Sequence, residues 1–224
     1  MRHGVRIQRF AIIKTMNNTA KNIINLYKEL NKLKQITRTG WERWHVEVDK
    51  VESVADHTYG TAILAMIIHS ELKLDLDIDR VLKMILLHET EEVRIGDIRP
   101  FDDPEKVKFK KTQGYNQAAE LLDNLNQSDE YKVILKEYYQ NETKESIFAH
   151  QCDKLEAILQ SDIYRDKCDI HSEQNKKTRE DLRRAGVDIK EGDDLLSMFA
   201  GYGVEAKYFD DDFMAIVNEI LARN

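Results

Sequence analysis

The chain has 224 residues, enough for one domain with a substantial core, and its two prolines, nine glycines and 33% charged residues favour a mostly helical protein. Its formal net charge of −7 argues against binding to a nucleic-acid polymer, which needs a basic surface, but a small anionic substrate stays open because a metal ion can reverse the local potential. No apolar run approaches the ~20 residues that span a bilayer, so no membrane partner is expected, and the two cysteines, Cys152 and Cys168, indicate reduced thiols in a cytoplasmic protein.

The N-terminal segment is basic, with no acid between Met1 and Lys28. A transit peptide would also be acid-poor, but it would be rich in serine, and this segment has none. A targeting segment is therefore the less favoured alternative. We expect residues 1–16 to form a poorly ordered leader, with Met16 as an alternative start, and the folded domain to span residues 17–224.

An apolar period of three to four residues follows almost to the C-terminus and predicts helices. The first apolar stripe covers residues 23–33, and the stretch TRTGWERWHVEVDKVES then breaks the pattern up to Ser53, a good N-cap. Ser53 begins a predicted helix at residues 53–73. The helix after it covers residues 75–93, is capped by Asp77 or Asp79, and stops around Gly96. A loop at 98–104, which holds both prolines, follows the helix at 75–93. In all, the helices predicted after Ser53 are 53–73, 75–93, 105–126, 129–140, 144–165 and 213–222. No repeat and no glycine-rich phosphate loop interrupts them, so the chain is predicted to form one all-α domain.

Three polar residues fall on helix faces that the pattern predicts to be buried: His57, His88 and Asp153. A buried imidazole or carboxylate is costly unless it is paired or binds a metal ion. Each one alone is more simply a satisfied core residue, whereas the three together favour a metal site. On a continuous helix His88 and Glu92 would share a face, with Glu89 about 100° round the axis. A zinc-protease H-E-x-x-H motif is excluded, because Glu92 stands where the second histidine would be.

These residues and the sequence around them resemble a known family. His57, His88 followed by an acid, and the distant Asp153 are similar to the H…HD…D signature of the HD-domain phosphohydrolases. The stretches RTGW, ESVADHTYG, LLHETEEVRIGDI and QCDKLEAILQ are similar to the 5′-deoxynucleotidase branch of that family. The resemblance implies a single-domain HD-type helical bundle that removes the 5′-phosphate of deoxynucleoside monophosphates, with a small-molecule nucleotide as substrate, and that forms a homodimer.

The resemblance also implies one divalent metal ion, either Mn²⁺, Co²⁺, Fe²⁺ or Zn²⁺. Its ligands would be His57, His88, Glu89 and Asp153. Glu92 would move the proton between water and the leaving oxygen, and Asp97 would belong to the same catalytic site.

The substrate contacts implied by the resemblance are Arg38, Trp41 and Thr58. Arg38 would meet the phosphate, and Trp41 would crowd the sugar so that a 2′-hydroxyl is disfavoured. Arg43 is an alternative for the arginine role, because the spacing in this segment varies between relatives.

The chain departs from the family pattern at Glu89, where the usual ligand is aspartate. The extra methylene requires the ion, the helix or the chelation to shift, so a catalytically weakened nucleotide-binding or scaffold protein is one alternative. A nucleoside triphosphate hydrolase is another, with the lysines of residues 105–111 meeting the phosphates, although a solvated helix face is the preferred interpretation of that segment. A dinuclear centre would need further histidines between His88 and Asp153, and only His150 lies there.

Overall fold

The computed structural model describes residues 18–99 and 101–223. The leader predicted for residues 1–16 lies outside the described residues. Within them, the chain forms helices and one isolated antiparallel bridge between Thr37 and Ser53. The prediction of an all-α fold is therefore confirmed, and no described helix is both long and apolar enough to cross a membrane.

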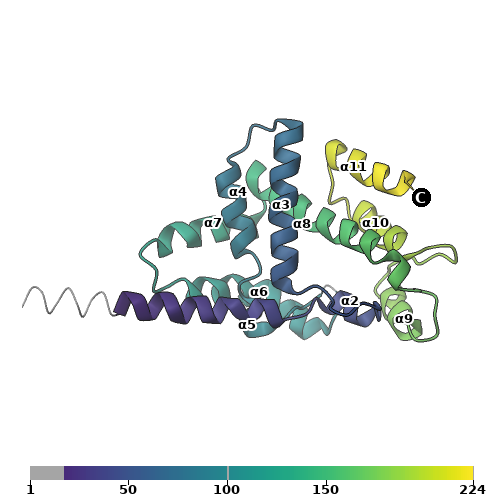
Figure 1. The fold of residues 1–224 in the computed structure, drawn as a ribbon, viewed down its shortest axis with the longest axis horizontal. Coiled ribbons are helices and arrows are strands. Elements are labelled where there is room, and N and C mark those ends of the chain that lie inside the picture. The colour runs from purple at the N-terminus through teal and green to yellow at the C-terminus, as the bar shows by residue number, and fades with distance from the viewer. Residues whose placement is uncertain (1–17, 100, 224) are drawn as a thin grey trace, which may run out of the picture.

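The helices follow one another in the order shown by the colours of Figure 1. The first covers residues 18–30 and runs directly into a 3₁₀ turn, η1. The bounds of the remaining elements are η1 Asn31–Gln35, α2 Thr39–Arg43, α3 Val54–Leu72, α4 Ile78–Leu87, α5 Glu92–Ile95, α6 Pro104–Leu121, α7 Ser128–Gln140, α8 Lys144–Ile163, η2 Arg165–Lys167, α9 Lys176–Arg184, α10 Leu195–Glu205 and α11 Asp211–Ala222.

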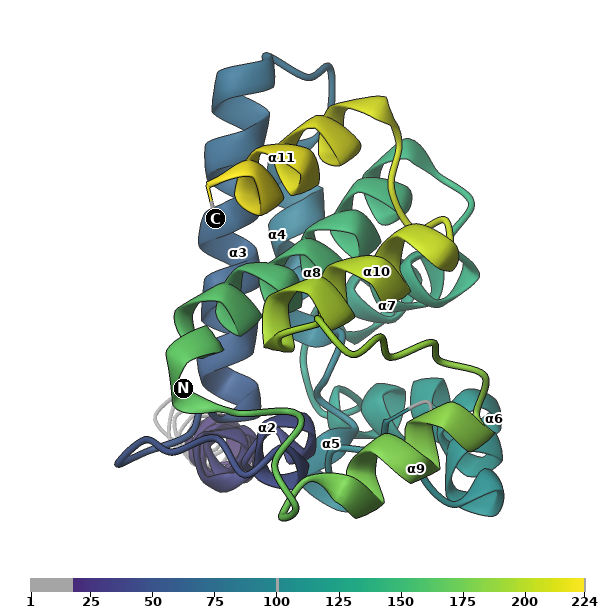
Figure 2. The ribbon, with the colours of Figure 1, turned by 90° about the vertical axis from the view of Figure 1, so that its right-hand side faces the viewer.

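Helix α8 is the centre of the bundle. It packs against α3, α4 and α7 on one side and against α10 and α11 on the other, as Figure 2 shows. The main core therefore forms along α8, with Phe148, Leu155 and Ile158 buried among residues of these neighbours. A second apolar cluster surrounds Trp41 and Trp44, next to α9 and the start of α10. Because α8 touches most of the bundle, residues on its surface can meet side chains from distant parts of the sequence.

The helix starts follow from capping residues in the sequence. Ser53 and Asp56 form a reciprocal capping box at the start of α3, which confirms the predicted N-cap. Asp77 rather than Asp79 caps α4, by accepting a hydrogen bond from the backbone N–H of Arg80. Each of these acceptors satisfies one of the N–H groups that the first helical turn leaves without a partner.

The single helix predicted for residues 75–93 was wrong, because it is broken after Leu87 into α4 and α5. Between them the backbone bonds span three residues, from the N–H of Thr90 to the carbonyl of Leu87 and from the N–H of Glu92 to the carbonyl of Glu89. Two side chains compete for the carbonyls that a continuing helix would use: His88 Nδ1 lies 2.6 Å from the Ile85 oxygen, and Thr90 Oγ1 lies 2.8 Å from the Leu87 oxygen. With three residues per turn, Glu89 rather than His88 shares a face with Glu92.

Besides the five-residue α2, two longer helices were not predicted from the sequence. Helix α9 is almost entirely polar and buries only Thr178 and Leu182, so it has no apolar stripe to detect. Helix α10 contains two glycines, Gly201 and Gly203, which lower helix propensity. Both helices contribute buried residues to the second apolar cluster, namely Leu182 from α9 and Leu195 and Met198 from α10.

Candidate metal centre and active site

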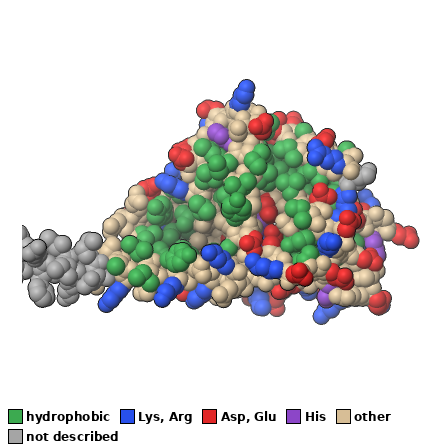
Figure 3. All heavy atoms as spheres, in the orientation of Figure 1, with side chains coloured by type: hydrophobic (Ala, Val, Ile, Leu, Met, Phe, Trp, Pro, Cys, Tyr) green, Lys and Arg blue, Asp and Glu red, His purple; other side chains and the backbone are tan. Residues whose placement is uncertain are grey.

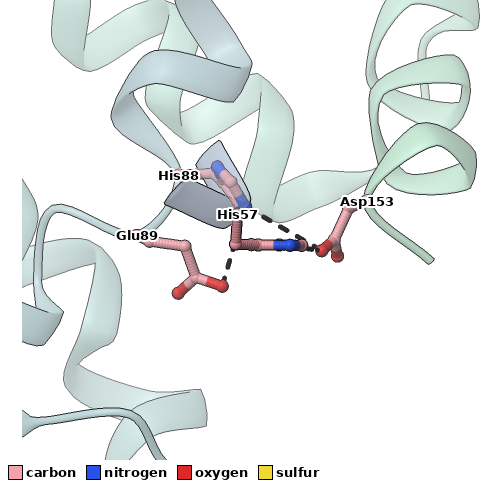
Figure 4. A group of neighbouring side chains, drawn as sticks. All are labelled: His57, His88, Glu89 and Asp153. Atoms are coloured by element: carbon pink, nitrogen blue, oxygen red, sulfur yellow. Dashed lines mark hydrogen bonds and ion pairs between the residues drawn. The ribbon is translucent and has the colours of Figure 1, made fainter. Parts of the chain in front are cut away.

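Four polar side chains meet where α3, the turn after α4, and α8 come together. His57 comes from α3, His88 and Glu89 from the turn, and Asp153 from α8 (Figure 4). One ligand atom of each lies within 4.8 Å of the others, and the four residues are 0–8% exposed. A buried group of two imidazoles and two carboxylates at this separation has the composition and the size of a divalent-metal site.

His88 supplies the test of whether a metal ion fits. Its Nδ1 must donate to the Ile85 carbonyl oxygen at 2.6 Å, because a carbonyl only accepts. The lone pair of Nε2 then faces the acids, 3.6 Å from Glu89 Oε1 and 4.0 Å from Asp153 Oδ1, and this buried nitrogen has no hydrogen-bond partner. Burial lowers the pKa of His88, which keeps the imidazole neutral. A neutral, oriented and unpartnered Nε2 is what a metal ligand requires.

His57 is oriented by a carboxylate behind it. Its Nδ1 lies 2.5 Å from Glu156 Oε2 and its Nε2 lies 2.9 Å from Asp153 Oδ1. Burial and the charge of Arg38 oppose protonation, but the two hydrogen bonds prevail and raise the pKa of His57 to about 9. A metal ion between Nε2 and Asp153 would take the place of this proton, while Glu156 kept the ring in position.

The space for Glu156 depends on a glycine in α3. A Cβ atom built on Gly60 would lie 2.6 Å from Glu156 Oε1, closer than real Cβ contacts allow. Gly60 therefore permits the close approach of α3 and α8 that brings Glu156 to His57.

The acidic turn is neutralised by a lysine from α6. Lys110 Nζ lies 3.2 Å from Glu89 Oε2, 3.8 Å from Glu91 Oε1 and 2.5 Å from Glu92 Oε1. Burial and the charge of Glu89 raise the pKa of Glu92 well above its ordinary value, against the opposing effect of Lys110. A carboxyl group whose pKa is raised is a stronger base than an ordinary carboxylate and is suited to accepting and donating a proton.

Arg38 and Asp97 form the opposite side of the site. Arg38 Nη1 lies 3.4 Å from Asp97 Oδ1 and 3.8 Å from Glu89 Oε1, so it reaches the acidic cluster. Asp97 also accepts hydrogen bonds from the backbone N–H of Thr39 at 2.6 Å and from its hydroxyl at 2.9 Å. Arg43, the alternative arginine, instead pairs with Asp181 and Asp102. The geometry thus favours Arg38 over Arg43 as the arginine of the site.

Trp41 is placed differently from the wall that the resemblance implied. It is 3% exposed, stacks on Phe199 at 4.8 Å between ring centroids, and donates from Nε1 to Glu52 Oε1 at 2.5 Å. These are the contacts of a core residue. Thr58 is half-buried next to His57, and its hydroxyl donates to the Val54 carbonyl within α3.

Two residues of the site were missed in the sequence. Lys110 was assigned to a solvated helix face, but it lies three or four residues from the inward-facing Val107 and Gly114 and therefore on the same side of α6. Glu156 follows Asp153 by three residues and so shares its face of α8. Helical spacing from known inward positions was the signal available for both.

Comparison with known proteins shows clear similarities. A family model described as "HD domain" matches residues 30–192. A protein named 5′-deoxynucleotidase HDDC2 from Bos taurus is 33% identical over 149 residues, which cover 66% of this chain and 70% of the relative. A protein named 5′-deoxynucleotidase hdd1 from Schizosaccharomyces pombe is 32% identical over 157 residues, covering 67% of this chain and 77% of the relative.

Solved structures show a similar fold. A predicted metal-dependent phosphohydrolase from Magnetospirillum magnetotacticum superimposes with a TM-score of 0.62 at 19% identity, covering 91% of this chain and 94% of that one. A conserved hypothetical protein from Pyrococcus furiosus gives a TM-score of 0.57 at 24% identity, covering 89% and 99%. At these identities the likeness concerns the arrangement of the helices.

Proposed function

The chain belongs to the HD-domain family, and from that premise we propose that it is a metal-dependent phosphohydrolase that removes the 5′-phosphate of deoxynucleoside monophosphates. Relatives at least 30% identical carry the name 5′-deoxynucleotidase, which supports the reaction and the substrate class. The proposal rests mainly on the Nε2 atom of His88. This atom is buried and has no hydrogen-bond partner, and it belongs to a group of two imidazoles and two carboxylates.

In this proposal one divalent ion is held by His57, His88, Glu89 and Asp153. When bound, the ion would supply Lewis acidity, by lowering the pKa of water and polarising a phosphoryl oxygen. The mixed nitrogen and oxygen donors suit Mn²⁺, Co²⁺, Fe²⁺ or Zn²⁺. Glu89 has its Oε1 toward His88 and its Oε2 toward Lys110, which supports single-oxygen binding by the longer side chain.

Glu92 would carry the proton. One of its oxygens pairs with Lys110, and the other, Oε2, is buried with no hydrogen-bond partner. That free oxygen can take the proton from attacking water and give it to the leaving 5′-oxygen. Arg38 would bind the phosphate, and Asp97 would hold both Arg38 and the backbone of Thr39 in place. Thr58, beside His57, would border the substrate.

We propose a preference for deoxynucleotides for two reasons. The relatives are named 5′-deoxynucleotidases, and the segment from Arg38 to Trp41 lies beside the candidate metal ligands. Because Trp41 is buried against Glu52, we propose that it stiffens this segment from behind, and a stiff wall is what steric rejection of a hydroxyl needs.

We further propose that two copies associate through the outer face of α3. Tyr59, Ile63, Met66 and Ile67 recur at helical spacing and are 39–69% exposed, and apolar side chains gather on this face in Figure 3. Ile63→Lys should give a monomer in light scattering, and a wild-type monomer would end the idea.

The unpaired Cys152 and Cys168 support a cytoplasmic location, and disulfide-linked cysteines in protein taken from its native cell would argue against it.

Phosphate release from a panel of nucleotides tests the proposed reaction. Deoxynucleoside monophosphates should release inorganic phosphate when a divalent metal is present, faster than ribonucleotides do, and a chelator should stop the release. Pyrophosphate or tripolyphosphate released from deoxynucleoside triphosphates would favour the alternative reaction. A folded, metal-loaded protein that releases no phosphate from any of them would favour the scaffold.

A further inference from the structure

A second group of acids adjoins the candidate metal ligands. One oxygen each of Glu89, Glu91 and Glu92 lies within 4.8 Å of the others. Glu91 and Glu92 are 1% and 0% exposed, so these carboxylates are removed from solvent. An oxygen-only group of this kind prefers hard divalent cations such as Mg²⁺, Ca²⁺ and Mn²⁺.

The cation that faces these three acids is a side chain of the protein, the ammonium group of Lys110. Lys110 reaches all three carboxylates from α6, at 3.2 Å from Glu89, 3.8 Å from Glu91 and 2.5 Å from Glu92. An ammonium group has three N–H donors, so it can face one oxygen of each acid and leaves the second oxygen of each acid to other partners. Two buried oxygens, Glu91 Oε2 and Glu92 Oε2, accept no hydrogen bond from the lysine, and Glu91 and Glu92 interact instead with Tyr139 and Glu89 respectively. The group is therefore built with more acceptors than its lysine satisfies.

We propose that the Lys110 ammonium occupies the position of a second divalent ion and so restricts the site to a single metal. Glu89 is common to both groups, with Oε2 toward Lys110 and Oε1 3.6 Å from His88 Nε2. In a dinuclear centre such a carboxylate would bridge two ions. Here Lys110 takes one of its two oxygens and leaves the other for the metal, which makes Lys110 a positioning residue for Glu89.

The test replaces the charge and keeps the length of the side chain. Lys110→Met would leave three buried carboxylates without a cation, and we expect this variant to bind two Mn²⁺ ions per chain where the wild type binds one. Because Glu89 would then bridge them, the two ions should give a spin-coupled electron paramagnetic resonance spectrum in place of the spectrum of an isolated Mn²⁺. Lys110→Arg keeps the positive charge and should bind one ion.

A matched variant locates the second ion. Adding Glu91→Gln to Lys110→Met removes a ligand of the second position and leaves all four candidate ligands of the first, so the ion count should return to one. Glu91→Gln alone should bind one ion, as the wild type does.

Several results would overturn the inference. A Lys110→Met protein that binds one isolated ion would do so, as would a wild type that binds two coupled ions. A Lys110→Met protein that stays unfolded with Mn²⁺ present would also overturn it, because the ion could then not replace the lysine. The ion count does not depend on turnover, so its outcome is independent of the phosphate-release panel that tests the proposed function.

Discussion

Glu89 and Glu92 lie on one face of the turn after α4, and both contact Lys110, yet their surroundings assign them different chemistry. Glu89 Oε1 points toward His88 Nε2, while Glu92 Oε2 is buried without a partner. The charge of Lys110 lowers the pKa of Glu89 in spite of burial, whereas burial and Glu89 raise the pKa of Glu92. A carboxylate that stays ionised is suited to hold a metal, and one whose pKa is raised is a stronger base and is suited to exchange a proton.

Replacing Glu92 by glutamine separates these roles. Glu92→Gln keeps the size of the side chain and removes the acid, so kcat should fall by ~10²–10⁴ while the metal content is unchanged. Glu89→Ala should instead lower the metal content, and added metal should restore part of the rate. Steady-state kinetics with metal analysis of both variants would show the difference. A Glu92→Gln enzyme with normal turnover would mean that another group, such as Asp97, carries the proton.

Gly60 acts on the metal site through Glu156. In Gly60→Ala the new methyl group would displace Glu156, and His57 would lose the carboxylate that orients its ring. Loss of such a partner typically costs ~10–100-fold in metal affinity. Competition with a chelating dye would measure the affinity, with Gly201→Ala as a control because, apart from its chain neighbours and the backbone of its own helix, no atom lies within 4 Å of its Cβ position. Equal affinities for the two variants would show that Glu156 does not orient the ligand.

At the scale of elements, α10 packs closely against its neighbours at one glycine. A Cβ atom on Gly203 would lie 2.9 Å from Phe209 Cε2 and 3.4 Å from Ile158 Cδ1. Overpacking of this kind costs ~1–3 kcal/mol, partly offset by the ~1 kcal/mol that alanine gains over glycine in a helix. Gly203→Ala should therefore unfold at lower denaturant concentration than Gly201→Ala, two residues earlier in the same helix. The reverse order would mean that the Phe209 ring moves aside at no cost.

The contact between α4 and α7 should depend on pH. Arg80 Nε donates to Glu137 Oε2 at 2.7 Å, and the Thr143 hydroxyl donates to Glu137 Oε1 at 2.6 Å. Burial opposes ionisation, but these hydrogen bonds prevail and lower the pKa of Glu137 below its ordinary value of 4.5. Since the folded pKa is the lower one, the stabilisation is complete above the unfolded pKa and is lost as the pH falls through the folded pKa.

Glu137→Gln should reveal this dependence. Near pH 7 the variant should be less stable than the wild type, by ~0.5–1 kcal/mol because the pair is partly exposed. The difference should shrink below pH 4.5, where the carboxylate of the unfolded chain becomes protonated first, and should be lost as the pH falls through the lower pKa of the folded state. Urea unfolding at several pH values would measure it, and a difference that grows toward low pH would contradict the assignment.

The sequence predicted the elements whose apolar faces meet the core and whose caps are local. Helices α3, α7 and α8 begin and end within about two residues of their predicted bounds, because their period and capping residues are both visible. The break between α4 and α5 was not predictable from period, since it arises from His88 and Thr90 bonding to backbone carbonyls. Helix α9 was missed because it packs through few buried residues.

In the site, too, some residues were predictable from the local sequence and others were not. The four candidate ligands were predicted from their order and the resemblance, and the structure brings them together. The residues that hold those ligands, Glu156 and Lys110, depend on which helices become neighbours. Such neighbours are set by tertiary packing, which the local sequence pattern does not contain.

At the scale of the whole molecule, the ligand set exists only when distant segments have docked. His57 on α3, the turn after α4 and Asp153 on α8 are joined by the packing of these helices along one core. Metal binding is therefore linked to folding, and an ion at 100 times its Kd would add about 2.7 kcal/mol to the stability of the native state. The buried acids favour the ion because water cannot screen their repulsion there, and Lys110 and Arg38 offset part of it.

The proposed chemistry depends on one divalent ion bound by His57, His88, Glu89 and Asp153. Anomalous diffraction from a crystal grown with Mn²⁺, measured at the manganese absorption edge, would locate that ion. We predict a single anomalous peak within ~2.0–2.3 Å of one atom of each of the four side chains, the usual length of such bonds. A peak bound by Glu91 and Glu92 instead, or no peak in a crystal of protein that releases phosphate, would contradict the claim.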